Sequence, residues 1–180
     1  NNALHLLLMP SLIACAFLNN ATVLRSDLLR LARRVYPYVA EEYFLRWSDD
    51  DLKGVVGELL EDLGNHGLLS ASEDRAVWQR PHAESSEAVQ LSLLARATVP
   101  IIERYYLAIS LLLKAGSGRL SQEALERQCQ LTAERMSLLY ELHSPEFFDR
   151  ALFGNFLDLL RSRGVLQTGA DGRLSYELPV

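Results

Sequence analysis

The sequence predicts a mainly α-helical protein with two short β-hairpin wings and no large sheet. Two stretches support this. Residues 144–179, SPEFFDRALFGNFLDLLRSRGVLQTGADGRLSYELP, have the order of a capped helix, a glycine stop and a hairpin. Residues 50–81, DDLKGVVGELLEDLGNHGLLSASEDRAVWQRP, repeat that order. Each half of the chain is therefore expected to end in a small hairpin.

In the later stretch, Ser144 suits a helix N-cap and Pro145 its first turn. An apolar face follows with helical spacing: Phe148, Leu152, Phe156, Leu159 and Leu160. Gly164 is placed as a left-handed stop. Residues 165–166 and 174–176 then flank a turn at 169–172. A helix followed by such a hairpin predicts tandem winged-helix-like units.

The two stretches match each other at one fixed shift of 97 positions. Seven positions match around the hairpins: Leu59, Leu60, Leu63, Gly67, Leu68, Leu69 and Val77 fall on Phe156, Leu157, Leu160, Gly164, Val165, Leu166 and Leu174. Five more match upstream: Leu28, Ala32, Val39, Tyr43 and Leu45 fall on Leu125, Cys129, Met136, Tyr140 and Leu142. Such self-similarity predicts a structural duplication. The alternative is that any two amphipathic helices can be slid into register.

Composition bounds the class of protein. The 180 residues are 49% apolar and 23% charged, which is typical of a globular chain with a buried core. The net charge of −5 counts against general nucleic-acid binding, which favours basic chains. Cys15 and Cys129 lie on apolar helical faces, so we expect buried thiols rather than a disulfide.

The N-terminal stretch 2–17 is almost wholly apolar, and we interpret it as a core helix of a larger body. A membrane-dipping segment is the alternative, although the stretch is short for a membrane span. Pro10 is expected to end or kink its helix. The chain begins without methionine, so we expect it to be a piece of a longer protein in which missing chemistry lies elsewhere.

The rest of the chain reads as helices and linkers. Residues 19–22 read as a loop, and residues 80–87 are the best linker candidate. Helices are expected from residue 26 or 27 to 44 with a kink at Pro37, over 52–66, over 86–115 with an interruption at Pro100, and over 121–141. The predicted organisation is a helix over 1–20 that continues from a missing core, a first unit over 21–81 and a second unit over 82–180.

Reactive groups are scattered along the sequence. The four histidines are His5, His66, His82 and His143. None has a second His or Cys at ligand spacing, so we predict neither a metal nor a cofactor site. His66 precedes the Gly67 stop and suits a capping role.

Acyl transfer can use a His base oriented by an Asp five positions later. Here only His82 and Glu87 come near that pattern, with the wrong acid, so no catalytic residue is assigned.

The densest basic cluster is formed by Arg25, Arg30, Arg33 and Arg34. A solvated helix face is the favoured interpretation. Contact with anionic lipid headgroups is the alternative, because such headgroups attract basic clusters.

Three segments carry a family resemblance. They are NNALHLLLMPSL at the start, YPYVAEEYFLRW over 36–47 and RMSLLYELHSPEFFDRALFGNFLDLLRSRGVL over 135–166. They resemble the C-terminal part of bacterial glycerol-3-phosphate 1-O-acyltransferases. The resemblance covers essentially the whole chain, and the ELHSPEFFD run is its most specific part.

The resemblance implies a non-catalytic C-terminal domain. Its parent enzyme would transfer an acyl chain from acyl-CoA or acyl carrier protein to the sn-1 hydroxyl of glycerol 3-phosphate, the first step of phospholipid synthesis, at the cytoplasmic face of the inner membrane. The catalytic His-x4-Asp motif would lie before Asn1. The resemblance places Asn1, Asn2 and His5 at the end of the catalytic core, as a candidate interface with it.

Two other classes of function stay open. A tandem winged-helix module that binds DNA or a protein would need a basic face on 52–66 or 147–163. The first of these helices is anionic, with Lys53 set against Glu58, Glu61 and Asp62. A membrane-surface module would use 2–17 and the arginine cluster, and is compatible with the acyltransferase reading.

Overall fold

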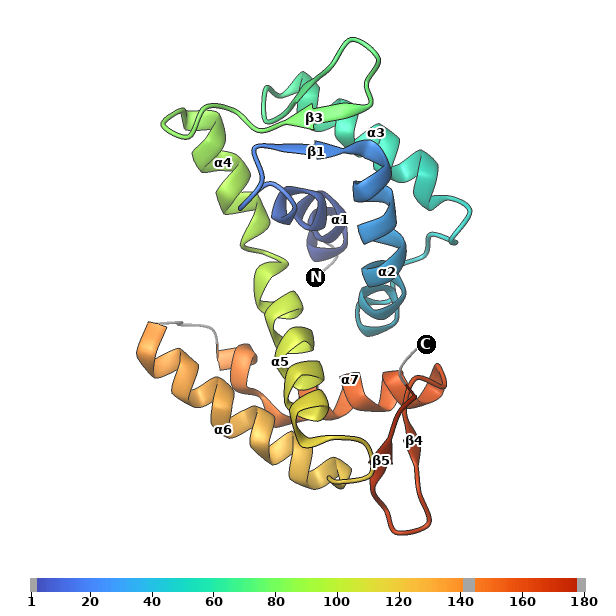
Figure 1. Ribbon diagram of the computed structural model, residues 1–180. Helices are drawn as coiled ribbons and strands as arrows, with labels where there is room; N and C mark the ends of the chain where they lie inside the picture. The colour runs from blue at the N-terminus through green and yellow to red at the C-terminus, as the bar shows by residue number, and fades with distance from the viewer. Residues whose placement is uncertain (1–2, 141–144, 178–180) are drawn as a thin grey trace. The chain divides into compact units, whose positions relative to one another are not determined.

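The computed structural model describes residues 3–140 and 145–177 of the chain. These fall into two compact units, residues 1–99 and 100–180. The helices and small antiparallel strand pairs of Figure 1 confirm a mainly α-helical fold with short hairpins. The domain boundaries that the sequence analysis placed after residues 20 and 81 stay predictions.

The first unit runs helix, strand, two helices, two strands and a last helix. Its elements are α1 (Ala3–Cys15), β1 (Thr22–Leu24), α2 (Arg25–Tyr43), α3 (Leu52–Asn65), β2 (Ser70–Ala71), β3 (Val77–Gln79) and α4 (Ser86–Ala95). The strands form an antiparallel sheet in the order β1-β3-β2. In Figure 1, α1 lies between α2 and α4 below this sheet.

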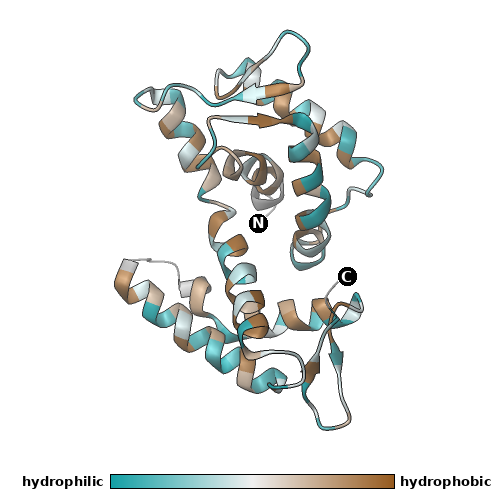
Figure 2. Ribbon diagram, viewed as in Figure 1, coloured by the Kyte–Doolittle hydropathy of each residue, from teal (hydrophilic) through white to brown (hydrophobic). Residues whose placement is uncertain are grey.

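The core of the first unit collects the apolar faces of its helices. Its largest buried side chains include Leu8, Met9, Phe17, Leu28 and Leu60. Figure 2 shows α1 as apolar along its length, whereas α2 carries a hydrophilic outer face. Burial on several sides explains why the N-terminal stretch reads as a nearly continuous apolar run.

Prolines interrupt the first unit less than the sequence suggests. Pro10 lies inside α1 and Pro37 inside α2, and both helices are continuous through them. Proline removes one helical hydrogen bond, and tertiary packing can compensate for that loss. Pro100, by contrast, does lie at a break, because α4 ends at Ala95 and α5 starts at Val99.

The second unit repeats the order of the first. Its elements are α5 (Val99–Ala115), α6 (Gln122–Tyr140), the 3-10 turn η1 (Pro145–Phe148), α7 (Arg150–Ser162), β4 (Gln167–Thr168) and β5 (Leu174–Ser175). The segment before α6 takes the place of β1. Ser121 forms an antiparallel bridge with Arg173, and the Leu174 amide donates to the Leu120 carbonyl at 2.8 Å.

The bounds of these elements confirm the duplication. Residue 25 begins α2, and residue 122, which is 97 positions later, begins α6. The same shift carries β2 at 70–71 onto β4 at 167–168. Sliding unrelated helices into register would not reproduce strands as well, so that alternative fails.

The helix ends before each hairpin are also equivalent. Gly67 has φ +72° and Gly164 has φ +71°. The Leu68 amide donates to Leu63 at 2.9 Å, and the Val165 amide donates to Leu160 at 2.9 Å. Both ends therefore close in the same left-handed cap, which only glycine adopts without strain.

Two details of the second hairpin correct the sequence prediction. The first strand is 167–168 rather than 165–166, because the amides of Val165 and Leu166 are taken by the Leu160 carbonyl. Val77 does not correspond to Leu174. When the two sheets are aligned by their strand pairings, Val77 takes the position of Arg173, and the buried Trp78 takes the position of the buried Leu174. The correspondence changes by one residue because the turn of the second hairpin is one residue shorter.

The start of the helix over 144–163 is also corrected. Ser144 lies outside the described residues, and the segment from Pro145 is a 3-10 turn. Asp149 caps α7 instead, with its Oδ1 accepting from the Ala151 amide at 2.8 Å. Short polar side chains are the usual caps, and Asp149 is one of them.

Candidate functional site

Two of the four histidines, His66 and His82, have side chains that the structure describes. His66 lies at the C-terminal end of α3, with Nδ1 2.7 Å from the Asp62 carbonyl, which fits its expected capping role. His82 is exposed, and its Nδ1 lies 3.5 Å from the Glu84 amide. His143, Asn1 and Asn2 lie outside the described residues, and His5 belongs to α1.

His82 and Glu87 come nearest to the His-acid pattern in the sequence, but Glu87 has a structural role. Glu87 lies in the first turn of α4, where its own backbone amide, Ser86 and Ser85 hold the pKa of its carboxyl below the usual range. Hydrogen bonds to a carboxylate favour its charged form. Glu87 therefore serves the helix terminus, where negative charge is stabilising.

A metal site would need several His, Cys, Asp or Glu side chains to converge within residues 3–140 and 145–177, which the structure describes. Within those ranges no group of three or more His, Cys, Asp or Glu side chains is arranged to hold a metal ion. Cys15 and Cys129 are free thiols. Burial raises the pKa of the Cys129 thiol to about 12, with the nearby Glu126 adding to the shift.

The arginine cluster does not form one face. Arg25 lies against α3, where its Nη2 is only 2.7 Å from the point that a Cβ on Gly57 would occupy. Arg30 pairs with Asp27 at 3.0 Å on the outer face of α2. Arg33 and Arg34 are exposed beside it. All four predicted arginines are exposed, although Arg25 also contacts α3 and Arg30 has a carboxylate partner.

Neither helix that precedes a hairpin offers a basic face. On α3, Lys53 is exposed together with Glu58 and Asp62, and Glu61 pairs with Arg75 at 2.7 Å. A phosphate backbone would meet net negative charge there.

On α7, Arg150 pairs with Glu126 at 3.1 Å, and Arg161 pairs with Asp158 at 2.8 Å. Each of these two guanidinium groups already has a carboxylate partner. The second helix is therefore no better suited to duplex binding than the first.

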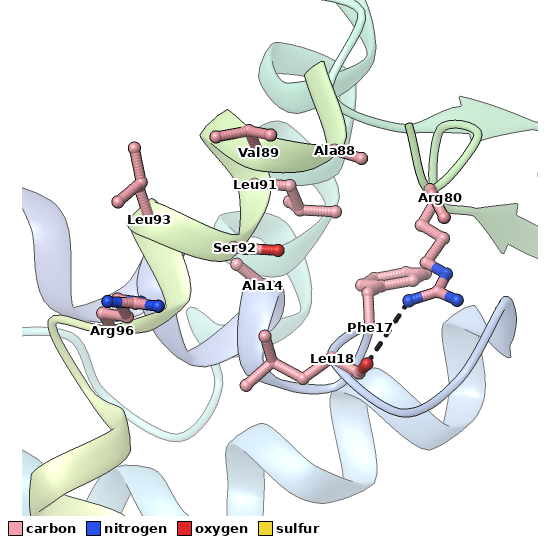
Figure 3. Close-up of a pocket in the computed structure, with 11 residues that line it drawn as sticks. Ala14, Phe17, Leu18, Arg80, Ala88, Val89, Leu91, Ser92, Leu93 and Arg96 are labelled. Carbon is pink, nitrogen blue, oxygen red and sulfur yellow. Dashed lines mark hydrogen bonds between the residues drawn. The ribbon is translucent and has the colours of Figure 1, made fainter. Parts of the chain in front are cut away.

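A pocket of about 290 Å³ opens beside the end of α1 in the first unit. Figure 3 shows the Phe17 ring next to Arg80, whose Nη1 donates to the Leu18 carbonyl at 3.3 Å. Side chains of α4, among them Val89 and Leu93, form the opposite wall. The lining is mainly apolar, and Arg80 and Arg96 are its charged members within the described chain.

No described helix combines the length and the apolar content that crossing a bilayer requires. The titratable groups described above have structural roles in packing, helix capping and surface ion pairs. The fold thus defines a helical protein region made of two hairpin-closed repeats.

Comparison with known proteins identifies the family. A family model described as the glycerol-3-phosphate acyltransferase C-terminal region matches residues 1–169, and the chain belongs to this family. Similar proteins include the glycerol-3-phosphate acyltransferases of Pseudomonas paraeruginosa, at 43% identity, and Pseudomonas fluorescens, at 41%. Each match covers 98% of this chain and 21% of the relative, so the chain spans about a fifth of the relatives' length.

Proposed function

We propose that these 180 residues are a non-catalytic C-terminal region of an enzyme that acylates glycerol 3-phosphate. In this proposal the donor is acyl-CoA or acyl carrier protein, the acceptor is the sn-1 hydroxyl, and the catalytic groups lie in the rest of the protein. The observation that carries it is the family match, which runs over residues 1–169 and concerns the C-terminal region of such enzymes. The relatives' names support the chemistry of the reaction.

The test compares two proteins in one assay. Acylation of radiolabelled glycerol 3-phosphate is measured for the full-length protein and for the 180-residue chain alone. We expect turnover by the full-length protein and none by the isolated chain. Turnover by the isolated chain would contradict a non-catalytic role, and an inactive full-length protein would contradict the assigned reaction.

We further propose that both units are winged-helix-like and serve protein contacts rather than nucleic acid. In the first unit, the order from α1 to β3 and the sheet order β1-β3-β2 support this. The ion-paired and anionic faces of α3 and α7 argue for protein partners. Salt-sensitive binding of duplex DNA at micromolar concentrations would favour the alternative of a nucleic-acid module.

A peripheral place at the cytoplasmic face of the inner membrane is also proposed. The exposed side chains of Arg33 and Arg34 suit anionic headgroups, each near-surface arginine contributing about 1 kcal/mol. The test is co-sedimentation of the full-length protein with vesicles that contain anionic lipid.

Reversal of charge at Arg33 and Arg34 to Glu should weaken that co-sedimentation. The same reversal at the exposed Arg127 of α6 serves as the control. Equal loss in both variants would count against the cluster as the contact.

A further inference from the structure

The pocket beside the end of α1 has the size and the lining of a small-molecule site. One wall consists of Ala14, Phe17 and Leu18, and the other is α4 (Figure 3). Its volume of about 290 Å³ lies at the lower end of the range of such sites, which is about 300–1,000 Å³. Ligand sites are typically apolar with a few polar groups, and this lining follows that pattern.

Helix α4 keeps an apolar side for the pocket. Val89 and Leu93, four residues apart on one side of the helix, line the pocket and are 55% and 58% exposed. Leu91 and Ala95 are buried, and the Ser11 hydroxyl of α1 donates to the Ala95 carbonyl at 3.2 Å. The contact with α1 therefore fixes α4 while leaving Val89 and Leu93 open to an apolar ligand.

Arg80 brings a fixed positive charge to one end of this pocket. Its side chain is half-buried, and its Nη1 donates to the Leu18 carbonyl at 3.3 Å. Its backbone amide donates to the Ala21 carbonyl at 3.0 Å, which anchors the residue a second time. A guanidinium group has five N–H donors, and the Leu18 carbonyl takes one of them. Arg80 is thus held in position beside the apolar walls.

The charge of the lining is positive although the net charge of the chain is −5. No Asp or Glu side chain lines the pocket within residues 3–140 and 145–177. The nearby Glu87 serves the N-terminus of α4, and its Cγ lies 3.9 Å from the point that a Cβ on Gly67 would occupy. The pocket therefore favours a ligand with a negative charge.

The two arginines of the pocket have different settings. Figure 3 shows Arg96 and Arg80 on opposite sides of the pocket. Arg96 follows the last turn of α4, where a cation stabilises the helix terminus. Arg80 has no such helix terminus beside it, so it is the cation that we assign to the ligand.

We propose that this pocket binds a single-chain anionic amphiphile, with its acyl chain along Val89 and Leu93 and its phosphate at Arg80. The identity of the headgroup rests on the proposed function, whose product is an acyl chain esterified to glycerol 3-phosphate. Arginine pairs with phosphate through two parallel N–H donors, and removing the acyl chain from water adds affinity with each methylene.

Both parts of the ligand are needed in this arrangement. A neutral acylglycerol would cover Val89 and Leu93 but would leave the charge of Arg80 without an anion. An amphiphile that carries a phosphate satisfies both. Selectivity for the phosphate therefore separates a built site from an apolar surface that takes up any acyl chain.

The experiment labels the full-length protein with 1-acyl-sn-glycerol 3-phosphate that carries a photoreactive diazirine in its acyl chain. A monoacylglycerol with the same diazirine chain is the neutral control probe. Both probes are used below saturation, so that the yield of labelling follows occupancy. After irradiation the labelled peptides are identified and quantified by mass spectrometry.

We expect label on residues 14–18 and 83–96, at a yield at least about tenfold higher for the phosphate probe than for the neutral one. Label confined to other parts of the protein would overturn the proposal, because it would show that the pocket is closed to the acyl chain or filled by another occupant. Equal labelling by the two probes would also overturn it, since Arg80 would then select no anion.

Variants test the two halves of the site separately. Arg80→Gln should lower the yield in the pocket about tenfold, and Leu93→Asp, at an exposed position, should lower it several-fold. The matched controls Arg127→Gln and Gln128→Asp change exposed residues of α6 and should leave the yield unchanged. Thermal unfolding checks that each variant is folded. Should Arg80→Gln unfold, Leu93→Asp still decides, and equal yields in a folded variant and its control would refute the site.

The proposed reaction is followed independently. Acylation of glycerol 3-phosphate by the unmodified protein is measured in parallel, and labelling needs no turnover. An active protein without label in the pocket would overturn the site and leave the reaction standing. An inactive protein with phosphate-selective label would overturn the reaction and leave the site standing.

Discussion

Substituting Gly164 by alanine tests the left-handed cap that ends α7. Its φ of +71° lies in the region where a Cβ clashes with the following carbonyl, which costs about 1–2 kcal/mol. No atom of the surroundings lies within 4 Å of the Cβ that alanine would add, so packing neither adds to this cost nor offsets it. Alanine also reduces the conformational entropy of the unfolded chain, which stabilises the folded state by about 0.4–1 kcal/mol. The net expectation is a loss of about 1 kcal/mol.

The matched control is Gly54→Ala in α3. Gly54 is equally free of neighbours within 4 Å, but it sits inside a helix with ordinary backbone angles. There alanine should stabilise the unit by about 0.5–1 kcal/mol. The same chemical change thus has opposite signs at the two glycines.

The assay is urea or thermal unfolding followed by circular dichroism. For a unit of this size, 1 kcal/mol shifts Tm by about 4–8 °C. Gly67→Ala should match Gly164→Ala, because the two caps have equivalent hydrogen bonds. If Gly164→Ala stabilised the protein, or if Gly67 and Gly164 differed in sign, the equivalence of the two helix ends would be refuted.

Three further predictions follow from the same repeats. Leu60→Ala and Leu157→Ala, both fully buried at equivalent positions, should each lower the unfolding free energy by about 2–5 kcal/mol; loss at only one site would contradict equivalent cores. Cys129, whose pKa is raised to about 12, should resist iodoacetamide until unfolding. Because the folded pKa lies above the ordinary thiol value of 9.0, its contribution to stability is full below pH 9 and falls as the pH rises toward 12; native labelling at pH 8 as fast as in urea would disprove its burial. Ser85→Ala, which removes the N-cap bond to the Ala88 amide at 3.1 Å, should cost about 1 kcal/mol in thermal unfolding, whereas Ser85→Asp should largely preserve stability.

Much of the fold could be predicted from local signals. Gly67 and Gly164 end helices for a reason internal to their own backbone, and the apolar spacing around Leu60 and Leu157 marks the buried side of each helix. The shift of 97 positions between these features can be found by comparing the two stretches of sequence, without knowing how the helices pack. The family resemblance likewise rests on residues that are consecutive in the sequence.

The first strand of the first unit was missed. Residues 22–24 were expected to lie partly in a loop, and they form β1 only because β3 pairs with them more than fifty residues later. A stretch of three residues is too short for an alternation of apolar and polar side chains to predict a strand. The partner, not the segment, decides that conformation.

The candidate surfaces divide in the same way. The sequence by itself determined that Arg25, Arg30, Arg33 and Arg34 occur together, but not that the Arg25 guanidinium lies against Gly57 of α3. Charge and periodicity are properties of residues and of one helix, so they can be read along the chain. Which side of a helix is covered depends on the neighbouring elements that the folded chain brings beside it. For that reason only the tertiary structure shows that Met9 and Leu12 of α1 are buried, whereas Tyr106 and Ile109 of α5 are exposed.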